Sequence, residues 1–416
     1  MNKGELINYW VEKYKDIGAD RILLGANDIP SDLRSLVATQ ISLKSNFMVK
    51  LPSWYSNPSI YIPTKLALEQ STGEVCARYK QRFISDTDIL CDFTGGFGVD
   101  FWAMATKAHK SYYIEQDKDL YEAARDNLTS LLGNDKMIEF IHGNSTSYLD
   151  YCADHDVSFI FMDPARRDTG DKNRRVFAID DCYPNAVEII RDINKIYSLK
   201  RKIPPKILVK LSPMLDVAHT LKTLPQAKEL NILCHKNEVK EILVYIDLEH
   251  TYQDFKHIPV IASNILKDDT DLIDIFTSTL NEEGGCKADY VEEIGQYVYE
   301  PNAGIMKSGM FKSLGLAFNI LQVSNDSHLY SSDRFIPDFP GRKFEVEEIL
   351  PFKSSLLKDL KSKKIKAQIT CRNFPLSPDE LRKKTGIKDD SSRTIIGTKM
   401  SDGTLFLLNC ISLYTR

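Results

Sequence analysis

The feature that most constrains the fold of this chain is the segment from Asp88 to Asp117, where two short apolar runs flank a glycine turn and a helix-like stretch. Its parts follow one another as Ile89–Cys91, Asp92, Thr94–Gly98, Val99–Lys107, Tyr112–Ile114 and Glu115. Strand, glycine loop, helix, strand and terminal acid is the order of the first βαβ unit of a nucleotide-binding sheet. The segment therefore predicts an α/β fold built around a parallel sheet.

Three glycines make the turn able to hold a ligand. Gly95, Gly96 and Gly98 have no Cβ, so the loop can bend sharply and its backbone can approach a ligand closely. The helix that follows presents unpaired N–H groups and the positive end of its dipole. Glu115 comes 23 residues after Asp92, near the separation at which a carboxylate binds the ribose hydroxyls of a nucleotide cofactor.

The spacing of the glycines discriminates between two cofactor classes. A dinucleotide needs Gly-x-Gly-x-x-Gly, because its pyrophosphate sits on the helix N-terminus. Here the loop reads Gly95-Gly96-Phe97-Gly98, and Asp92 precedes it by three residues. A carboxylate at that place repels a pyrophosphate but suits a cofactor with a cationic amino-acid end. The loop thus disfavours an NAD-dependent dehydrogenase and favours S-adenosylmethionine.

The stretch from Asp92 to Gly98 resembles motif I of the class I S-adenosylmethionine-dependent methyltransferases, usually acid-x-Gly-x-Gly-x-Gly. Thr94 stands in place of the first glycine, as it does in some methyltransferases that modify RNA guanine. The resemblance implies that Glu115 binds the cofactor ribose and that the loop holds the methionine end. The loop residues concerned are Asp92, Thr94, Gly95, Gly96 and Gly98.

Two further stretches complete the cofactor site that this resemblance implies. The third predicted strand ends at Asn144, whose amide oxygen is expected to accept a hydrogen bond from the adenine amino group. The polar string Leu68–Gly73 precedes the first strand, where several RNA methyltransferase families fold a segment over the cofactor. Ser71, Thr72 or backbone N–H groups are expected to contact the methionine carboxylate there, and the alternative is an ordinary helix terminus.

The fourth predicted strand, Val157–Met162, leads into the pair Asp163-Pro164. Open α/β sheets bind substrates at the carboxyl ends of their strands, so the chemistry is expected here. The pair resembles motif IV of amino-methyltransferases, (Asp or Asn)-Pro-Pro-aromatic, in which the acidic or amide side chain and a backbone carbonyl accept hydrogen bonds from the target amine. Alignment of that amine with the sulfonium supplies most of the catalysis.

Two residues depart from motif IV. Ala165 replaces the second proline and Arg166 replaces the aromatic residue, so the stacking wall is either missing or supplied by Arg166 or another residue. Arg166 and Arg167 can also grip phosphates, or they form a surface ion pair with a neighbouring aspartate. The sequence thus assigns Asp163, Pro164 and Arg166 to the chemical step.

The order of parts along the chain extends the resemblance to nearly the whole sequence. Helical periodicity fills the N-terminal residues, alternating strands and helices follow, and the composition changes from about residue 275. With the string Glu-Pro-Asn-Ala-x-Ile-Met-Lys at 300–307, this order resembles a bacterial group of class I methyltransferases that carry a ferredoxin-like and a THUMP-like domain. The guanine-N2 methyltransferases, including the cap trimethylguanosine synthases, are more distantly similar.

The expected fold class is α/β: a Rossmann-like, seven-stranded class I methyltransferase sheet with an N-terminal helical region and small α+β domains at the C-terminus. The last two strands, Glu241–Asp247 and Ile258–Ser263, are expected to pair antiparallel at one edge of the sheet. The predicted boundaries are 1–85 for the helical region, 86–275 for the methyltransferase domain, 276–337 for the ferredoxin-like domain and 338–416 for the THUMP-like domain.

Composition limits the partners. The net charge of −4 provides no global basic field for nucleic acid, so a basic surface has to be local. None of the eight cysteines forms a C-x-x-C pair, and no metal site is expected. The sequence shows neither a signal-peptide core nor an apolar run of membrane-spanning length. A cytoplasmic protein without a membrane partner is expected, and no obligatory protein partner is evident.

The function that these features predict is S-adenosylmethionine-dependent methylation of an exocyclic amine of an RNA base, with guanine N2 favoured and rRNA or tRNA as the substrate. Ribose 2′-O methylation is an alternative that could use Asp163 with Lys210, although the remaining lysine and glutamate of that arrangement are not recognisable in the sequence. Pyrimidine C5 methylation lacks its cysteine nucleophile at a strand end. A non-catalytic RNA-binding or ribosome-assembly protein that retains the cofactor fold is the alternative from a different class.

Overall fold

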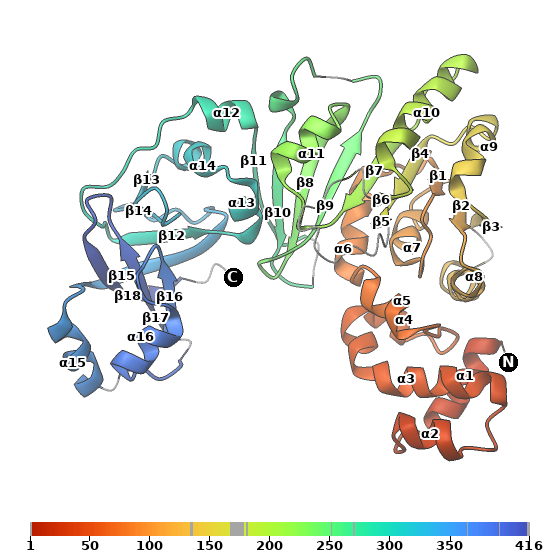
Figure 1. Cartoon of the computed structure of the whole chain (residues 1–416), viewed down its shortest axis with the longest axis horizontal. Coiled ribbons are helices and arrows are strands. Elements are labelled where there is room, and N and C mark those ends of the chain that lie inside the picture. Colours follow the sequence, from red (N-terminus) through yellow and green to blue (C-terminus); the bar gives the residue numbers. More distant parts are fainter. Residues whose placement is uncertain are drawn as a thin grey trace. The chain divides into compact units, whose positions relative to one another are not determined.

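The structure is a computed structural model that describes residues 2–133, 136–166, 179, 182–250, 252–268, 271–363, 365–390 and 392–413. The chain divides into two compact units (Figure 1). The first unit comprises 1–231, 240–255 and 267–271, and the second comprises 232–239, 256–266 and 272–416. Each unit is described by itself.

Helices fill the N-terminal part of the first unit, as predicted. They are α1 (Lys3–Lys13), α2 (Ala19–Gly25), α3 (Ser31–Lys50), α4 (Pro52–Tyr55), α5 (Lys65–Gln70), α6 (Glu74–Tyr79) and the 3₁₀ turn η1 (Lys80–Phe83). The extended segment between α4 and α5 is held by two side-chain amides. Gln40 exchanges two hydrogen bonds with the backbone of Ile62, and Asn127 does the same with the backbone of Tyr61. Because Asn127 belongs to α8 (Lys118–Leu132), these bonds fix the N-terminal helices to the sheet domain.

The sheet that carries the predicted site includes the order β3-β2-β1-β4-β7-β9-β8. Its strands are β1 (Ile89–Asp92), β2 (Lys110–Glu115), β3 (Met137–His142), β4 (Phe159–Met162), β7 (Lys206–Leu211), β8 (Ala227–His235) and β9 (Glu238–Ile246). Strands β3, β2, β1, β4 and β7 are parallel, and β9 is antiparallel to β7. Every residue of β4 is buried, as its apolar run predicts. The carboxyl ends of the parallel strands therefore meet at one edge, where the predicted site lies.

Helices and two short strands complete the first unit. They are α7 (Val99–Ala105), α9 (Leu149–Asp154), α10 (Ala186–Leu199), α11 (Val217–Thr223), the 3₁₀ turn η2 (Ser145–Tyr148) and the hairpin-like pair β5 (Ala165–Arg166) and β6 (Cys182–Tyr183). The β5–β6 pair forms directly after Asp163-Pro164 and is antiparallel. It therefore stands at the carboxyl end of β4.

The prediction for the last strands is wrong in its pairing. Strand β9 pairs with β7, whereas β10 (Val260–Ile265) pairs with β11 (Ile273–Ser278), both antiparallel. Strand β8 was not predicted, because Lys228, Glu229 and Asn231 interrupt its apolar pattern. Asn231 is buried and donates its Nδ2 to the Tyr79 hydroxyl (3.0 Å). Counted with β10 and β11, nine strands of the described residues follow one another in the sheet order, instead of seven.

The second unit contains a sheet of order β13-β14-β12-β15-β18-β17-β16. Its other elements are β12 (Tyr297–Pro301), β13 (Leu321–Gln322), β14 (Tyr330–Ser332), β15 (Gly341–Pro351), β16 (Gln368–Arg372), β17 (Arg393–Lys399), β18 (Leu405–Ser412), α12 (Leu280–Gly285), α13 (Ala303–Ser308), α14 (Phe311–Phe318), α15 (Ser354–Lys363) and α16 (Pro378–Thr385). Strand β15 pairs with β12 over its first half and with β18 over most of its length. The two small α+β regions predicted here consequently share one sheet.

A buried carboxylate connects distant strands of that sheet. Glu300 of β12 accepts from Arg342 Nε (2.5 Å) and Arg372 Nε (2.6 Å). Arg372 belongs to β16, four places from β12 in the sheet order. Four strand spacings amount to about 19 Å in a flat sheet, which is more than an arginine side chain spans. The sheet must therefore curl between β12 and β16, and Glu300 joins these two strands.

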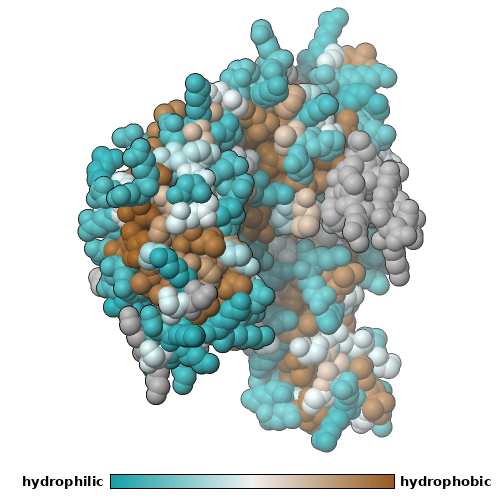
Figure 2. Space-filling view, turned by 60° about the vertical axis from the view of Figure 1, so that its left-hand side comes forward, coloured by the Kyte–Doolittle hydropathy of each residue, from teal (hydrophilic) through white to brown (hydrophobic). Residues whose placement is uncertain are grey.

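Hydrophobic and hydrophilic side chains are both present on the surface. On the face seen in Figure 2, hydrophobic residues form areas that hydrophilic residues interrupt. Among the residues that the structure describes, no helix is both long and apolar enough to cross a membrane.

Candidate active site

The glycine loop takes the conformation for which its glycines are needed. Gly96 and Gly98 have φ of +57° and +87°, values that residues with a Cβ rarely adopt. A Cβ on Gly95 would lie 2.3 Å from the ring of Tyr113, so that position is closed by packing. Tyr113 in turn donates its hydroxyl to the Gly96 carbonyl (2.6 Å). The loop backbone is thus held open above the N-terminus of α7.

Glu115 ends β2 beside the loop, where the sequence places it. Its Oε2 accepts from Gly96 N and its Oε1 accepts from Asp117 N, both at 2.7 Å. Two backbone donors fix the carboxylate against the cavity wall and leave its outer lone pairs directed away from the loop. This geometry suits a ligand with two neighbouring hydroxyls, such as a ribose.

Asp92 and Thr94 organise the loop from below. Asp92 is 1% exposed, and its Oδ1 accepts from Thr94 N (2.8 Å). Burial raises the pKa of Asp92 well above its ordinary value, and the hydrogen bond from Thr94 opposes the shift. The Thr94 hydroxyl also accepts from Asp163 N (2.7 Å). Thr94, which departs from motif I, therefore connects the glycine loop to the start of motif IV.

A cavity of about 270 Å³ opens at this edge of the sheet. Most of the predicted residues line it: Ser71, Thr72, Asp92, Thr94, Gly95, Gly96, Gly98, Glu115, Asn144 and Asp163. Pro164 is buried and lies outside the lining. Arg166 belongs to β5, where it pairs with Cys182, and its side chain lies outside the described part. Arg167 lies outside the described residues.

Asn144, Ser71 and Thr72, which line the cavity, form hydrogen bonds to other residues of the protein. Asn144 Oδ1 accepts from Thr146 N (3.1 Å), while its Nδ2 donates to the Tyr183 hydroxyl (2.7 Å). Ser71 donates to the Leu68 carbonyl (2.9 Å). Thr72 donates to Asp100 Oδ2 (2.7 Å). The roles predicted for them on adenine and on the methionine carboxylate stay predictions.

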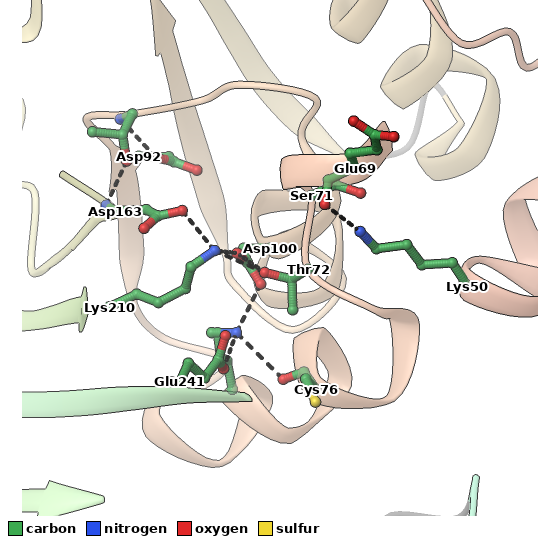
Figure 3. Close-up of polar contacts among 12 residues, drawn as sticks. Lys50, Glu69, Ser71, Thr72, Cys76, Asp92, Asp100, Asp163, Lys210 and Glu241 are labelled. Atoms are coloured by element: carbon green, nitrogen blue, oxygen red, sulfur yellow. Dashed lines mark hydrogen bonds and ion pairs between the residues drawn. The ribbon is translucent and has the colours of Figure 1, made fainter. Parts of the chain in front are cut away.

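A network of charged side chains, three of which (Asp100, Asp163 and Lys210) line the cavity, connects several elements of the domain (Figure 3). Lys210 Nζ contacts Asp163 Oδ2 (2.6 Å), Thr72 Oγ1 (2.8 Å) and Asp100 Oδ2 (3.0 Å). Lys80 Nζ contacts the other oxygen of Asp100 (2.9 Å) and Glu241 Oε1 (2.5 Å). Asp163 is the most exposed member, with 38% of its side chain accessible. Two cations and three carboxylates thus form one chain that ends at the cavity.

The charges of the network hold one another in the ionised state. Burial by itself lowers the pKa of both lysines, but their carboxylate partners outweigh it: the pKa of Lys80 is raised, and that of Lys210 is raised well above its ordinary value. Burial likewise favours a neutral Asp100, yet the two lysines hold the pKa of Asp100 below its usual range. Burial raises the pKa of Glu241, although the positive charge of Lys80 acts in the opposite direction. The network is therefore stable only as a complete set.

A third lysine supports the segment that carries Ser71 and Thr72. Lys50 Nζ donates to the carbonyls of Leu68 (2.6 Å) and Glu69 (2.9 Å) at the end of α5. Burial, with repulsion from Lys210, lowers the pKa of Lys50 to about 8. Lys50 thereby ties α3 to the turn that borders the cavity (Figure 3).

The sequence analysis did not identify Lys80, Asp100 or Glu241. Asp100 is the one charged residue of α7, a helix in which every residue is buried, and that pattern could have revealed it. Glu241 precedes the apolar run Ile242–Val244 in the same way. The sequence does not reveal that Lys80 is buried. The turn η1 contains two basic residues, Lys80 and Arg82, and the sequence pattern does not show which of them points into the protein.

Comparison with known proteins agrees with this architecture. Family models match the chain at 5–43, described as "N-terminal domain in putative methyltransferase", at 297–340, described as a ferredoxin-like domain, and at 341–410, described as THUMP domain-like. A solved structure titled "putative methyltransferase from Porphyromonas gingivalis W83" is 38% identical, with a TM-score of 0.90 and 100% of both chains covered. An uncharacterized S-adenosylmethionine-dependent methyltransferase of Mycobacterium tuberculosis is 22% identical over 353 residues, covering 83% of this chain and 87% of the relative.

The sheet, the glycine loop and the carboxylate after β2 define a class I S-adenosylmethionine-dependent methyltransferase, which confirms the predicted fold class and cofactor. The chain belongs to the same family as the methyltransferase from Porphyromonas gingivalis. The cavity fits the cofactor, because the backbone of the glycine loop and the carboxylate of Glu115 line it together.

Replacement of Glu115 by alanine is expected to weaken cofactor binding by roughly 10- to 100-fold, since a hydrogen bond to a charged group contributes about 1.5–3 kcal/mol. Calorimetric titration with S-adenosylhomocysteine measures this. Glu115→Gln is the matched variant, because it keeps an acceptor oxygen and should lose less. Unchanged affinity in the alanine variant would remove Glu115 from the cofactor site.

Proposed function

We propose that this enzyme methylates an exocyclic amine of an RNA base, with guanine N2 favoured. The observation that supports the proposal is the position of Asp163. Its backbone N–H is held by Thr94 and its Oδ2 by Lys210, while the side chain remains partly accessible to the cavity. The Asp163 side chain is 38% exposed, so it can accept a hydrogen bond from a substrate N–H.

The arrangement explains what the protein residues contribute to methyl transfer. When bound, S-adenosylmethionine supplies a methyl group on a sulfonium, which is an excellent leaving group. Asp163 accepts a hydrogen bond from the target amine and thereby orients the lone pair of the amine nitrogen toward the methyl group. The bound substrate is then aligned for the transfer. Lys210 fixes the rotamer of Asp163, and Glu115 fixes the ribose end of the cofactor. The amine loses its proton toward the Asp163 carboxylate.

The remaining regions of the chain fit an RNA substrate. The proposed division is a helical region at 1–85, the methyltransferase domain at 86–275, a ferredoxin-like domain at 276–337 and a THUMP-like domain at 338–416. The basic run at 361–366 is proposed to contact phosphates. Such contacts release counterions, so RNA binding should weaken as the salt concentration rises.

A second candidate, ribose 2′-O methylation, is favoured by one observation. A second lysine and a glutamate that would accompany Asp163 and Lys210 in such a site are not recognisable in the sequence. The charged network contains one of each, Lys80 and Glu241. However, a lysine that deprotonates a ribose hydroxyl must itself be neutral. All three protons of Lys210 face oxygen acceptors, and its raised pKa keeps it charged. The geometry therefore supports the amine acceptor better.

One experiment tests the function and separates the candidates. Total RNA from a deletion strain and its parent is digested to nucleosides and compared by mass spectrometry. RNA from the deletion strain is also incubated with purified protein and methyl-labelled S-adenosylmethionine. We expect one methylated base to be missing in the deletion strain and restored by the protein. A methyl group on ribose would select the second candidate, and identical nucleosides with no transfer would support a non-catalytic RNA-binding protein.

A further inference from the structure

The departure from motif IV leaves the acceptor without its aromatic neighbour, and the structure places another aromatic residue at that corner. Tyr183 of β6 pairs directly with Ala165 of β5 in antiparallel register. Directly opposed residues of an antiparallel pair project to the same face, with Cβ atoms about 4.5–5.5 Å apart. Both residues line the cavity. The small side chain of Ala165 leaves the neighbouring space open to the tyrosine ring.

The hydroxyl of Tyr183 fixes where its ring lies. It accepts from Asn144 Nδ2 (2.7 Å), at the end of β3, whereas the Tyr183 backbone pairs with the strand that follows Asp163-Pro164. The side chain therefore extends between the ends of β3 and β4, along the wall of the cavity. Tyr183 is half-buried and belongs to the lining of the cavity.

We propose that the ring of Tyr183 is the face on which the planar acceptor base stacks, with Asp163 engaging the edge of the same base. The inference rests on the proposed function, because stacking requires a planar aromatic acceptor. It assigns to a residue 20 positions after Asp163 the role that motif IV usually gives to a residue three positions after its acid. Every base offers a π-face, and base–aromatic stacking is lost when the ring is removed.

The test uses the full-length enzyme and RNA from the deletion strain. Methyl transfer from labelled S-adenosylmethionine is measured as a function of RNA concentration for wild type, Tyr183→Phe, Tyr183→Leu and Tyr183→Ala. Loss of the ring is expected to lower kcat/KM for RNA by roughly 5- to 150-fold in the leucine and alanine variants, while the phenylalanine variant stays within about 5-fold of wild type. Affinity for S-adenosylhomocysteine, measured by calorimetry, should change little in all three variants.

Four outcomes overturn the inference. Wild-type levels of transfer by Tyr183→Ala would show that the ring is not used, with the proposed function intact. An equal loss in Tyr183→Phe would assign the effect to the bond with Asn144, and a matching loss of S-adenosylhomocysteine affinity would assign the ring to the cofactor. If wild-type enzyme itself transfers no methyl group to this RNA, the proposed function and the inference fail together. Tyr252→Ala, an exposed tyrosine outside the cavity lining, is the matched control, and thermal unfolding confirms that each variant folds.

Discussion

Lys80→Met is expected to destabilise the protein by about 3–5 kcal/mol, because removal of one member of a buried ionic set leaves its partners without compensation. Lys80 has no exposed side-chain surface, and it contacts Asp100 and Glu241, which are 10% and 6% exposed. Methionine fills the space of the lysine stem but supplies no charge. The three carboxylates of the network would then remain with the single cation of Lys210, and a buried one would have to take up a proton.

Denaturant unfolding of the wild-type protein and of Lys80→Met measures this loss of stability. Two further variants show where the loss comes from. Lys118→Met removes a lysine that pairs with Glu122 on the surface of α8, where 73% of the lysine is exposed, and should cost less than about 0.5 kcal/mol. Adding Glu241→Gln to Lys80→Met removes one of the uncompensated charges and should recover part of the stability. A loss below about 1 kcal/mol for Lys80→Met, or no recovery in the double variant, would contradict the network as described.

Asp163→Ala is expected to reduce the rate of methyl transfer by about 10²- to 10³-fold, the range over which loss of a positioned hydrogen-bonding group lowers kcat. The substitution removes the oxygen that accepts from the target amine. It leaves Lys210 bound to Asp100 and Thr72, so the floor of the cavity should persist. Cofactor affinity is therefore expected to stay within a few-fold of wild type.

Initial rates with deletion-strain RNA, combined with S-adenosylhomocysteine titration, separate these effects. Asp163→Asn keeps an acceptor oxygen and should retain more activity than the alanine variant. Transfer at the wild-type rate in Asp163→Ala would exclude the assigned role. A parallel collapse of cofactor affinity would instead show that Asp163 serves the cofactor site.

Local patterns in the sequence were sufficient for the first part of the site. The predicted helix at Val99–Lys107 and the predicted strand at Val157–Met162 form as α7 and β4. The glycine turn follows β1 and Glu115 ends β2, as expected, since a strand, a tight turn and a helix N-terminus leave their marks within about 30 residues of chain. Helix α5 ends within the polar string Leu68–Gly73, and α6 begins directly after it. These features depend on neighbours in the sequence, and the sequence displays them.

Other features depend on residues that are distant along the chain. Strand β8 carries a buried asparagine, Asn231, that donates to Tyr79, a residue far from it along the chain. Glu241, which pairs with Lys80 in the ionic network, lies on β9, far from Lys80 along the chain. The aromatic residue beside motif IV stands on β6, opposite Ala165, instead of within the motif.

The sequence by itself determined the class of fold, the cofactor loop and the acid–proline corner, because each is written in consecutive residues with a period or a spacing that local geometry requires. Only the tertiary structure decided which charges are buried together and that Tyr183 lies opposite Ala165. Burial and ion pairing act between side chains that the folded sheet brings within 3 Å of each other, as in the contact of Lys210 with Asp163 at 2.6 Å, and no pattern along the chain records those distances.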